Sequence, residues 1–344
     1  MKIKQYCWGP GSFRFILSTF VIIHHFTRLS LGGAAVYLFF ALSGYWICKM
    51  WESKYSKVQS PIITFIISRV WRLGPVFLFC SMLAVFITVL LPLLVPPVTT
   101  PEPLSIRNYI TSFVLLGYNT NPQGPLGPAW SLDIEMQFYL LAPMILMALN
   151  KKPLMVSVII ISIGCASSLL FEEKLITSFL PFFLIGILAA KFPNYIHGKK
   201  KLTLSSALVI IIIFSFILSP TLRPVLFGGA HPSNLFKYNE LLNILIALLV
   251  LPFALSTVIV PSNKLDKLLS DMSYSLYLFH WIPIIIVSYY FPSLSKQPIG
   301  TRTEIMVVIL IFIYMASLAI TVFIDRPLMK KRSTYVIDYK RISS

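Results

Sequence analysis

Charged residues are scarce in this sequence. Only 12% of its 344 residues are charged and 57% are hydrophobic, whereas soluble domains carry roughly 25% charged residues. No polar segment is long enough to form a separate soluble domain. The shortage of charge excludes an ordinary soluble domain and indicates a chain that lies in a membrane.

Segments of alternating polarity are also missing. A membrane β-barrel would show segments of about ten residues with alternating polarity, but apolar runs such as 204–218 and 241–260 do not alternate. We therefore predict an all-α, polytopic membrane protein with about ten transmembrane helices, forming a single transmembrane domain over 1–344. The expected spans are 12–28, 33–51, 74–95, 132–149, 154–171, 175–192, 203–219, 240–260, 272–291 and 304–324.

Acidic residues are few, and the formal net charge is +17. In a soluble protein this excess would suggest a nucleic-acid partner. Here the Lys and Arg residues lie in short tracts between apolar runs: 21 of the 29 fall on the side of the two termini, 7 on the opposite side, and Arg14 inside a span. The positive-inside rule then predicts cytoplasmic termini, with membrane lipid rather than nucleic acid as the partner.

Cysteine is rare, and several catalytic motifs are absent. Cys7, Cys48, Cys80 and Cys165 have no motif spacing, and we interpret them as small buried apolar residues. The sequence has no cluster of His, Cys and Asp with zinc spacing, so we expect no metal. It also lacks a Gly-x-Ser-x-Gly elbow and a phosphate-binding Gly-rich loop.

Ionisable residues inside membrane spans are costly and mark candidate functional sites. The first span carries Arg14, His24 and His25. Arg14 and His25 are eleven residues apart, which is about 16 Å along a helix and close to three full turns, so both lie on one face. The alternative is that Arg14 snorkels and His25 is interfacial. His24 points elsewhere, which favours a structural or interfacial role.

Two arginines precede the third span. Arg69 and Arg72 are three residues apart and share one face of a helix. Guanidinium groups make bidentate contacts with phosphates, so the pair is a candidate phosphate site at the cytoplasmic mouth. The alternative is an ordinary positive-inside anchor.

Two acids lie at the outer start of the fourth span, just after Trp130. Asp133 can satisfy the N-terminal end of the helix dipole. Glu135 lies deeper, at about the expected level of His25. A His–carboxylate pair is a common arrangement for general base catalysis. The preceding link, 96–131, is rich in proline, and we expect an ordered outer lid or a re-entrant loop.

Three further features lie in or beside spans. Ser43 precedes Gly44 in the second span, and the ninth span carries Tyr274, Tyr277 and His280, the last near mid-membrane. The Asp325-Arg326-Pro327 segment ends the tenth span. For the serines, hydrogen bonding within or between helices is the alternative to a functional role.

In chain order, these features resemble the membrane acyltransferase-3 family, the acyltransferases of bacterial surface polysaccharides. The resemblance covers nearly the whole chain. Its motifs are Arg-x10-His (Arg14 and His25), Phe-Phe-x-x-Ser-Gly (within Val36–Tyr45), Arg-x-x-Arg (within Arg69–Pro75), Trp-Ser-Leu-x-x-Glu (from Trp130) and Tyr-x-x-Tyr-Leu-x-His (Tyr274 to His280). One departure is Asp325, where the family commonly has Glu.

The resemblance implies an O-acyltransferase that uses acyl-CoA, most often acetyl-CoA, and a glycan hydroxyl on the outer side. Arg69 and Arg72 would hold the nucleotide phosphates, and Arg14 would contact the pyrophosphate or the start of the pantetheine arm. His25 would be the general base, and Glu135 would orient His25 or bind the acceptor. A covalent intermediate on His25 or Ser43 stays open, and His280 is a donor-channel candidate.

The resemblance also implies a bacterial inner-membrane protein of the stand-alone type, without a C-terminal hydrolase-like domain. The acceptor could be a lipopolysaccharide O-antigen, a capsule, an exopolysaccharide, a lipid-linked glycan or a small glycoside. A transporter or flippase of a lipid-linked glycan is the competing class, since it too would need charge inside the membrane. The absence of an internal repeat speaks against a transporter built from inverted repeats.

Overall fold

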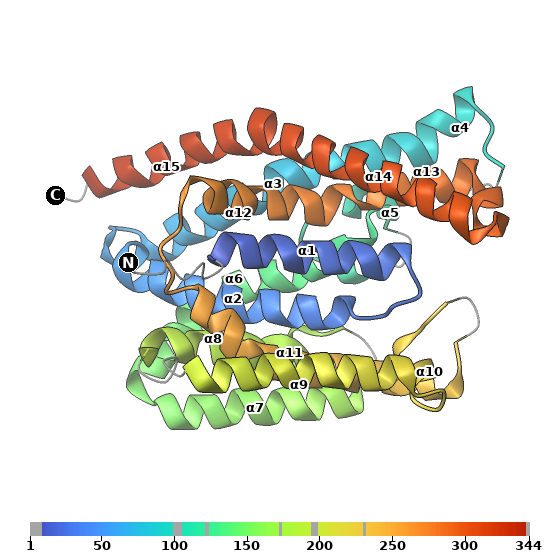
Figure 1. The fold of residues 1–344 in the computed structure, drawn as a ribbon. Helices are drawn as coiled ribbons and strands as arrows, with labels where there is room; N and C mark the ends of the chain where they lie inside the picture. The colour runs from blue at the N-terminus through green and yellow to red at the C-terminus, as the bar shows by residue number, and fades with distance from the viewer. Residues whose placement is uncertain are drawn as a thin grey trace, which may run out of the picture. The chain divides into compact units, whose positions relative to one another are not determined.

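The computed structural model describes residues 9–98, 105–120, 124–171, 174–193, 199–229 and 232–341. These residues are mainly helical, as expected for an all-α protein (Figure 1). The helices are α1 (Pro10–Phe26), α2 (Gly32–Ser53), α3 (Pro61–Val85), α4 (Leu91–Leu94), α5 (Ile106–Thr111), α6 (Trp130–Lys151), α7 (Pro153–Leu170), α8 (Ile176–Lys191), α9 (Lys199–Leu218), α10 (Arg223–Leu226), α11 (Asn239–Thr257), α12 (Lys264–Phe279), α13 (Trp281–Tyr290), α14 (Ile299–Ile320) and α15 (Arg326–Arg341).

Each of the ten expected spans overlaps helix, and the ninth, 272–291, is shared between α12 and α13. In the described part of the chain, seven helical segments are long and apolar enough to cross a membrane. The other three expected spans fall on α1, α8 and α9; α1 and α8 have 17 and 16 residues, and the apolar part of α9 is short. The chain is therefore a multi-pass membrane protein, while the number of crossings stays a prediction.

Large apolar side chains are exposed along these helices. Leu93, Leu154, Leu169 and Phe323 are each between 78% and 86% exposed. Such a surface is unfavourable in water but suits the hydrocarbon of a bilayer, which is as apolar as the side chains. The exposed apolar surface therefore agrees with the membrane class that the composition predicts.

The chain divides into two compact units, one comprising Met1–Met50 and Ala148–Ser273 and the other Trp51–Met147 and Tyr274–Ser344. Neither unit is continuous in sequence. The prediction of one functional domain over 1–344 concerns the activity of the chain and stays a prediction.

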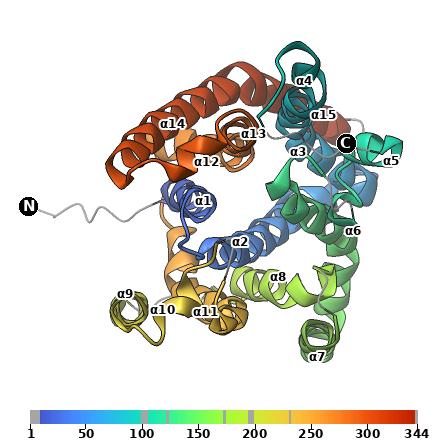
Figure 2. The ribbon, with the colours of Figure 1, turned by 90° about the vertical axis from the view of Figure 1, so that its right-hand side faces the viewer.

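In the first unit, α2 packs closely against α8. A Cβ atom on Gly44 would lie 2.1 Å from the carbonyl oxygen of Phe183, and one on Gly186 would lie 1.8 Å from that of Ala41. The two glycines therefore let the backbones approach, as small residues do between membrane helices. Phe40 stacks on Phe183 with ring centroids 4.7 Å apart. In the same unit, α7 packs beside α8 and α9 beside α11 (Figure 2).

The start of α1 is held by a buried carboxylate on α12. Asp266 accepts hydrogen bonds from the backbone N–H groups of Gly11 (3.2 Å) and Ser12 (2.7 Å), and from the hydroxyl of Ser12 (2.8 Å). These N–H groups have no partner within their own helix, so Asp266 satisfies them. Further along α1, the hydroxyl of Ser18 donates to the carbonyl of Ser273 at 2.8 Å. These contacts hold α1, the helix that carries Arg14 and His25, against α12.

In the second unit, α3 begins before the expected third span, and the helix of the tenth span extends beyond its expected end. The helix of the third span begins at Pro61 and contains Pro75, so it starts 13 residues before the expected span start at 74. The helix of the tenth span does not end at Asp325-Arg326-Pro327. It continues through a π-helical turn, Thr321–Asp325, into α15, and Pro327 is the second residue of α15. Helix α15 runs beside α3 (Figure 1).

The cysteines follow the expectation only in part. Cys48 and Cys80 are fully buried, as predicted for small apolar residues. Cys165 is exposed, so its predicted burial is wrong; it lies on α7, an apolar helix whose side chains are largely exposed. Cys7 lies outside the described residues.

Candidate functional site

The candidate residues fall in both units. The first unit holds Arg14, His24, His25 and Ser43, and the second holds Arg69, Arg72, Trp130, Asp133, Glu135, Tyr274, Tyr277 and His280. The expected partnership of His25 with Glu135 would join a residue of each unit, and it stays a prediction.

Arg14 and His25 both lie within α1, and both side chains are half-buried. Because α1 is one uninterrupted α-helix from Pro10 to Phe26, their eleven-residue spacing places them on one face, about 16 Å apart along the axis. The structure thus supplies the helix on which the spacing argument depends.

His24 lies in the last turn of α1 and packs against the segment that follows this helix. Its Nδ1 is hydrogen-bonded to the hydroxyl of Ser30 at 3.3 Å, and its ring centroid lies 4.7 Å from that of His25. A Cβ on Gly32 would lie 2.6 Å from the His24 ring, so the turn into α2 closes on this ring. These contacts fit the structural role expected of His24.

Ser43 is buried, with 5% of its surface exposed, next to the close approach of α2 and α8 at Gly44. The glycine of the Ser-Gly pair therefore has a packing role, because the close approach of the two helices leaves no room for a Cβ. A catalytic role for Ser43 stays a prediction.

Arg69 is almost fully buried in an aromatic environment. Only 4% of its surface is exposed, and its Nη2 donates to the hydroxyl of Tyr55 at 3.0 Å. The guanidinium carbon lies 5.5–5.8 Å from the ring centroids of Tyr55, Phe65 and Tyr139, within the range of cation–π attraction. Tyr55 has no motif around it, and only the fold reveals it as a partner of Arg69.

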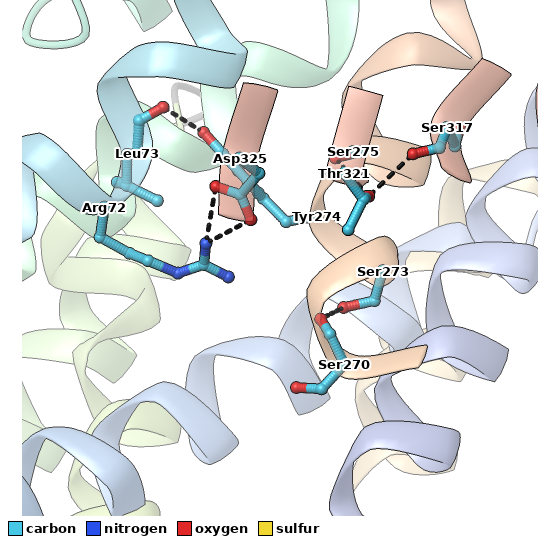
Figure 3. A network of polar contacts seen from close by, with 9 residues as sticks. All are labelled: Arg72, Leu73, Ser270, Ser273, Tyr274, Ser275, Ser317, Thr321 and Asp325. Carbon is cyan, nitrogen blue, oxygen red and sulfur yellow. Dashed lines mark hydrogen bonds and ion pairs between the residues drawn. The ribbon is translucent and has the colours of Figure 1, made fainter. Parts of the chain in front are cut away.

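Arg72 forms an ion pair that was not anticipated. Its Nη1 donates to both carboxylate oxygens of Asp325, at 3.0 and 3.2 Å, as Figure 3 shows. Its guanidinium carbon lies 5.3 Å from the ring centroid of Tyr274, and the hydroxyl of Tyr274 donates to the carbonyl of Leu73 at 2.6 Å. Asp325 is 1% exposed, so the residue interpreted as a helix end is instead a buried partner of Arg72.

The π-helical turn that carries Asp325 is tied to α12. The hydroxyl of Thr321 donates to the hydroxyl of Ser275 at 3.0 Å and to the carbonyl of Ser317 at 2.8 Å (Figure 3). A π turn inserts one extra residue into the helix and is frequent at functional sites. Here the π turn ends at Asp325, the residue that pairs with Arg72.

Asp133 anchors the loop that precedes α6. This carboxylate is fully buried and accepts hydrogen bonds from the backbone N–H groups of Gly117 (3.1 Å) and Asn119 (2.8 Å) and from the side chain of Gln137 (2.9 Å). The dipole role expected of Asp133 thus extends to holding a distant segment of the chain.

The described part of the link 96–131 is ordered against the same helix start. The hydroxyl of Tyr118 accepts from the N–H of Leu126 at 2.7 Å. Burial raises the pKa of the Tyr118 phenol, although this hydrogen bond opposes the effect, so the phenol stays neutral. A Cβ on Gly124 would lie 2.8 Å from the Tyr118 ring. The described residues of the link are ordered, and the choice between an outer lid and a re-entrant loop stays a prediction; residues 99–104 and 121–123 lie outside the described part.

The Trp-Ser-Leu-x-x-Glu segment contacts the late Tyr-x-x-Tyr-Leu-x-His segment. Trp130 is half-buried at the first position of α6. The hydroxyl of Ser131 donates to the carbonyl of Pro128 at 3.0 Å and is hydrogen-bonded to the hydroxyl of Tyr277 at 2.7 Å. The structure thus brings together two motifs that are far apart in the sequence.

Glu135 follows Ser131 by four residues on α6, and His280 follows Tyr277 by three residues. Glu135 is half-buried and accepts a hydrogen bond from the hydroxyl of Tyr139. His280 is fully buried at the turn between α12 and α13, and its Nδ1 lies 3.2 Å from the carbonyl of Leu276. The ring centroids of Tyr277 and His280 are 6.3 Å apart. Among the described residues, no group of three or more His, Cys, Asp and Glu could hold a metal ion.

The chain matches known acyltransferases along most of its length. A family model described as an acyltransferase domain matches residues 11–326. Two similar proteins are the O-acetyltransferase OatA of Staphylococcus aureus strain NCTC 8325 / PS 47 and that of strain COL, each 27% identical over 372 aligned residues, with 96% of this chain and 58% of the relative covered. The chain therefore spans little more than half the length of these relatives.

No solved structure matches this chain. Because the family match covers nearly the whole sequence and includes every candidate residue named above, the chain belongs to the acyltransferase-3 family.

Proposed function

We propose that this chain is a membrane O-acyltransferase that moves an acetyl group from acetyl-CoA to a hydroxyl of a bacterial surface glycan. The observation that carries this proposal is the family match over residues 11–326. The matched relatives are O-acetyltransferases, which favours an acetyl group and an oxygen acceptor. A cytoplasmic donor, an outer acceptor and a location in the inner membrane are parts of the same proposal.

Arg69 and Arg72 are the proposed ligands of the donor's phosphates. A guanidinium carries five N–H donors in a planar fork. Arg72 can therefore hold Asp325 through Nη1 and still contact a phosphate. The ion pair with Asp325 and the rings around Arg69 restrict both side chains, which lowers the entropy lost when an anion binds. Arg14 is proposed to contact the pyrophosphate or the pantetheine arm.

His25 is the proposed general base. In the proposed step its imidazole takes the proton of the acceptor hydroxyl, the oxygen forms a bond to the thioester carbonyl carbon, and the carbon–sulfur bond breaks. The proton on His25 then goes to the CoA thiolate, which leaves as the free thiol. Glu135 is proposed to orient His25 or to bind the acceptor, and Tyr139, which donates to Glu135, would restrict that carboxylate.

The test is the release of free CoA thiol by the purified full-length protein supplied with acetyl-CoA and surface glycan. His25→Ala removes the base, so we expect a loss of activity of roughly 100-fold or more. His24→Gln is the matched control because it changes the neighbouring imidazole, which the structure places in packing contacts; its activity should stay within about threefold. Full activity in His25→Ala at normal protein levels would rule out His25 as the base.

A second measurement separates the enzyme from a glycan flippase. NMR of surface polysaccharide from cells with and without the gene should show acetyl esters only when the gene is present. A flippase would change the amount of surface glycan without adding an ester, and its purified form would release no thiol from acetyl-CoA. That pair of results would overturn the proposed reaction.

A further inference from the structure

Arg332 lies on α15, beyond residue 326, where the family match ends. No motif in the sequence gave it a role. Its Nη1 is buried and has no hydrogen-bond partner among the residues that the structure describes. A buried N–H donor without an acceptor is costly, so the position of this guanidinium requires an explanation.

The packing of α15 on α3 brings Arg332 toward the arginines of α3. Trp71 of α3 and Tyr335 of α15 have ring centroids 6.1 Å apart. Arg332 precedes Tyr335 by three residues, so the two side chains lie on the same face of α15. Trp71 stands next to Arg72 and two residues after Arg69. The helix contact therefore places three guanidinium groups in one region of the second unit.

Arg332 lies among other charged groups of the second unit. Arg332 interacts electrostatically with Arg69 and Arg72, and with Asp325 and Tyr55. Among these groups, Asp325 is the one carboxylate, and it already accepts both hydrogen bonds from Arg72 Nη1. The groups that act on Arg332 thus include two further guanidiniums and one carboxylate, where burial weakens solvent screening. An anion with more than one negative charge would offset the repulsion among the guanidiniums.

We propose that Arg332 completes a single phosphate-binding site with Arg69 and Arg72. Arginine forks match the geometry of phosphate oxygens and bind them bidentately. A pyrophosphate or phosphomonoester would supply negative charge among the guanidiniums and an acceptor for Arg332 Nη1. The nucleotide end of acyl-CoA carries such groups, and this identification rests on the proposed function; a phospholipid headgroup offers the same phosphate chemistry.

The experiment measures binding to the purified full-length protein in detergent, with three probes used separately: inorganic pyrophosphate, coenzyme A, and micelles with added phosphatidylglycerol. Arg332→Gln should weaken pyrophosphate and coenzyme A by about tenfold or more, because one charge-assisted contact is lost. Arg332→Lys keeps the charge but loses the fork, and should weaken both by about threefold or more. Lys331→Gln removes an exposed charge from the neighbouring position of α15 and should change each affinity by less than about twofold.

The outcomes separate this site from the proposed reaction. If Arg332→Gln weakens pyrophosphate but wild-type protein does not bind coenzyme A, the phosphate site stands and the proposed donor is wrong. If Arg332→Gln weakens the binding of phosphatidylglycerol alone, the site stands and its ligand is a lipid headgroup. If Arg332→Gln and Arg332→Lys match Lys331→Gln with all three probes, or if wild-type protein binds none of them, the three-arginine site is overturned. Melting curves without ligand show whether each variant is folded. If Arg332→Gln is not folded, the affinities of Arg332→Lys decide between these outcomes.

Discussion

At the scale of single residues, two buried aspartates organise the second unit. Asp133 accepts three hydrogen bonds, two of them from the backbone of the preceding loop, and Asp325 accepts two from Arg72. A buried carboxylate is stable only when it is paired or hydrogen-bonded. Asp133 meets this condition through partners on the preceding loop and its own helix, and Asp325 meets it through Arg72, which is distant in the sequence.

Asp133→Asn tests the anchoring role of this carboxylate. The change removes the charge and one of the acceptor oxygens, so at least one backbone N–H, at Gly117 or Asn119, loses its partner. We expect a loss of stability of roughly 2 kcal/mol and faster proteolysis of the loop before α6. Thermal unfolding and limited proteolysis of the protein in detergent measure these effects. Glu304→Gln, a change at an exposed residue, is the control, and equal melting temperatures for the two variants would contradict the role of Asp133.

At the scale of helices, glycine decides how closely two elements approach. Gly44 and Gly186 permit contact between the backbones of α2 and α8, since a Cβ at either position would overlap a carbonyl oxygen. Aromatic rings such as those of Phe40 and Phe183 pack beside this contact. The packing of α2, the helix that carries Ser43, therefore depends on backbone contact as well as on side-chain contacts.

Gly186→Ala should separate α2 from α8, because its Cβ would lie 1.8 Å from the backbone oxygen of Ala41. Overpacking of this kind costs about 1–3 kcal/mol. Gly74→Ala in α3 is the matched control, since a Cβ there meets nothing within 4 Å, and it should stabilise the helix by roughly 0.5–1 kcal/mol. Melting temperatures that fall only for Gly186→Ala would support this packing. A fall for Gly74→Ala alone would contradict it.

At the scale of the whole molecule, composition and charge pattern dominate. The low charge content and the exposed apolar side chains suit a bilayer, and the clustering of Lys and Arg in alternate links predicts orientation. The proposed reaction depends on this orientation, because a donor from the cytoplasm and an acceptor outside must approach from opposite sides.

Reporter fusions test the predicted cytoplasmic termini. A fluorescent protein fused after Ser344 should fold and fluoresce, and alkaline phosphatase at the same point should be inactive, because the ten predicted spans place 21 of the basic residues on the side of the termini, and basic residues favour the cytoplasmic side. The same reporters fused within the link 96–131 should give the opposite pattern. An active phosphatase at Ser344 together with an inactive one in the link would reverse the topology.

The amino-acid sequence by itself determined the membrane class, the helical architecture and the approximate helix positions. A helix satisfies its own backbone hydrogen bonds, so an apolar run of suitable length is enough to specify it in a bilayer. Local spacing also sufficed to place Arg14 and His25 on one helix, and the family motifs were readable in order. The ends of the third and tenth helices were not, because prolines at 75 and 327 are accommodated within longer helices.

Only the tertiary structure decided the partners of the charged residues. Arg72 with Asp325, Arg69 with Tyr55 and Asp133 with the loop at Gly117 are contacts between segments that no local pattern relates. Their selection depends on which helix faces pack together, as Arg332 shows: on sequence grounds it is one basic residue among many, and the contact of α15 with α3 is what brings it to Arg69 and Arg72. Buried charges need specific partners, and the fold supplies those partners at a distance along the chain.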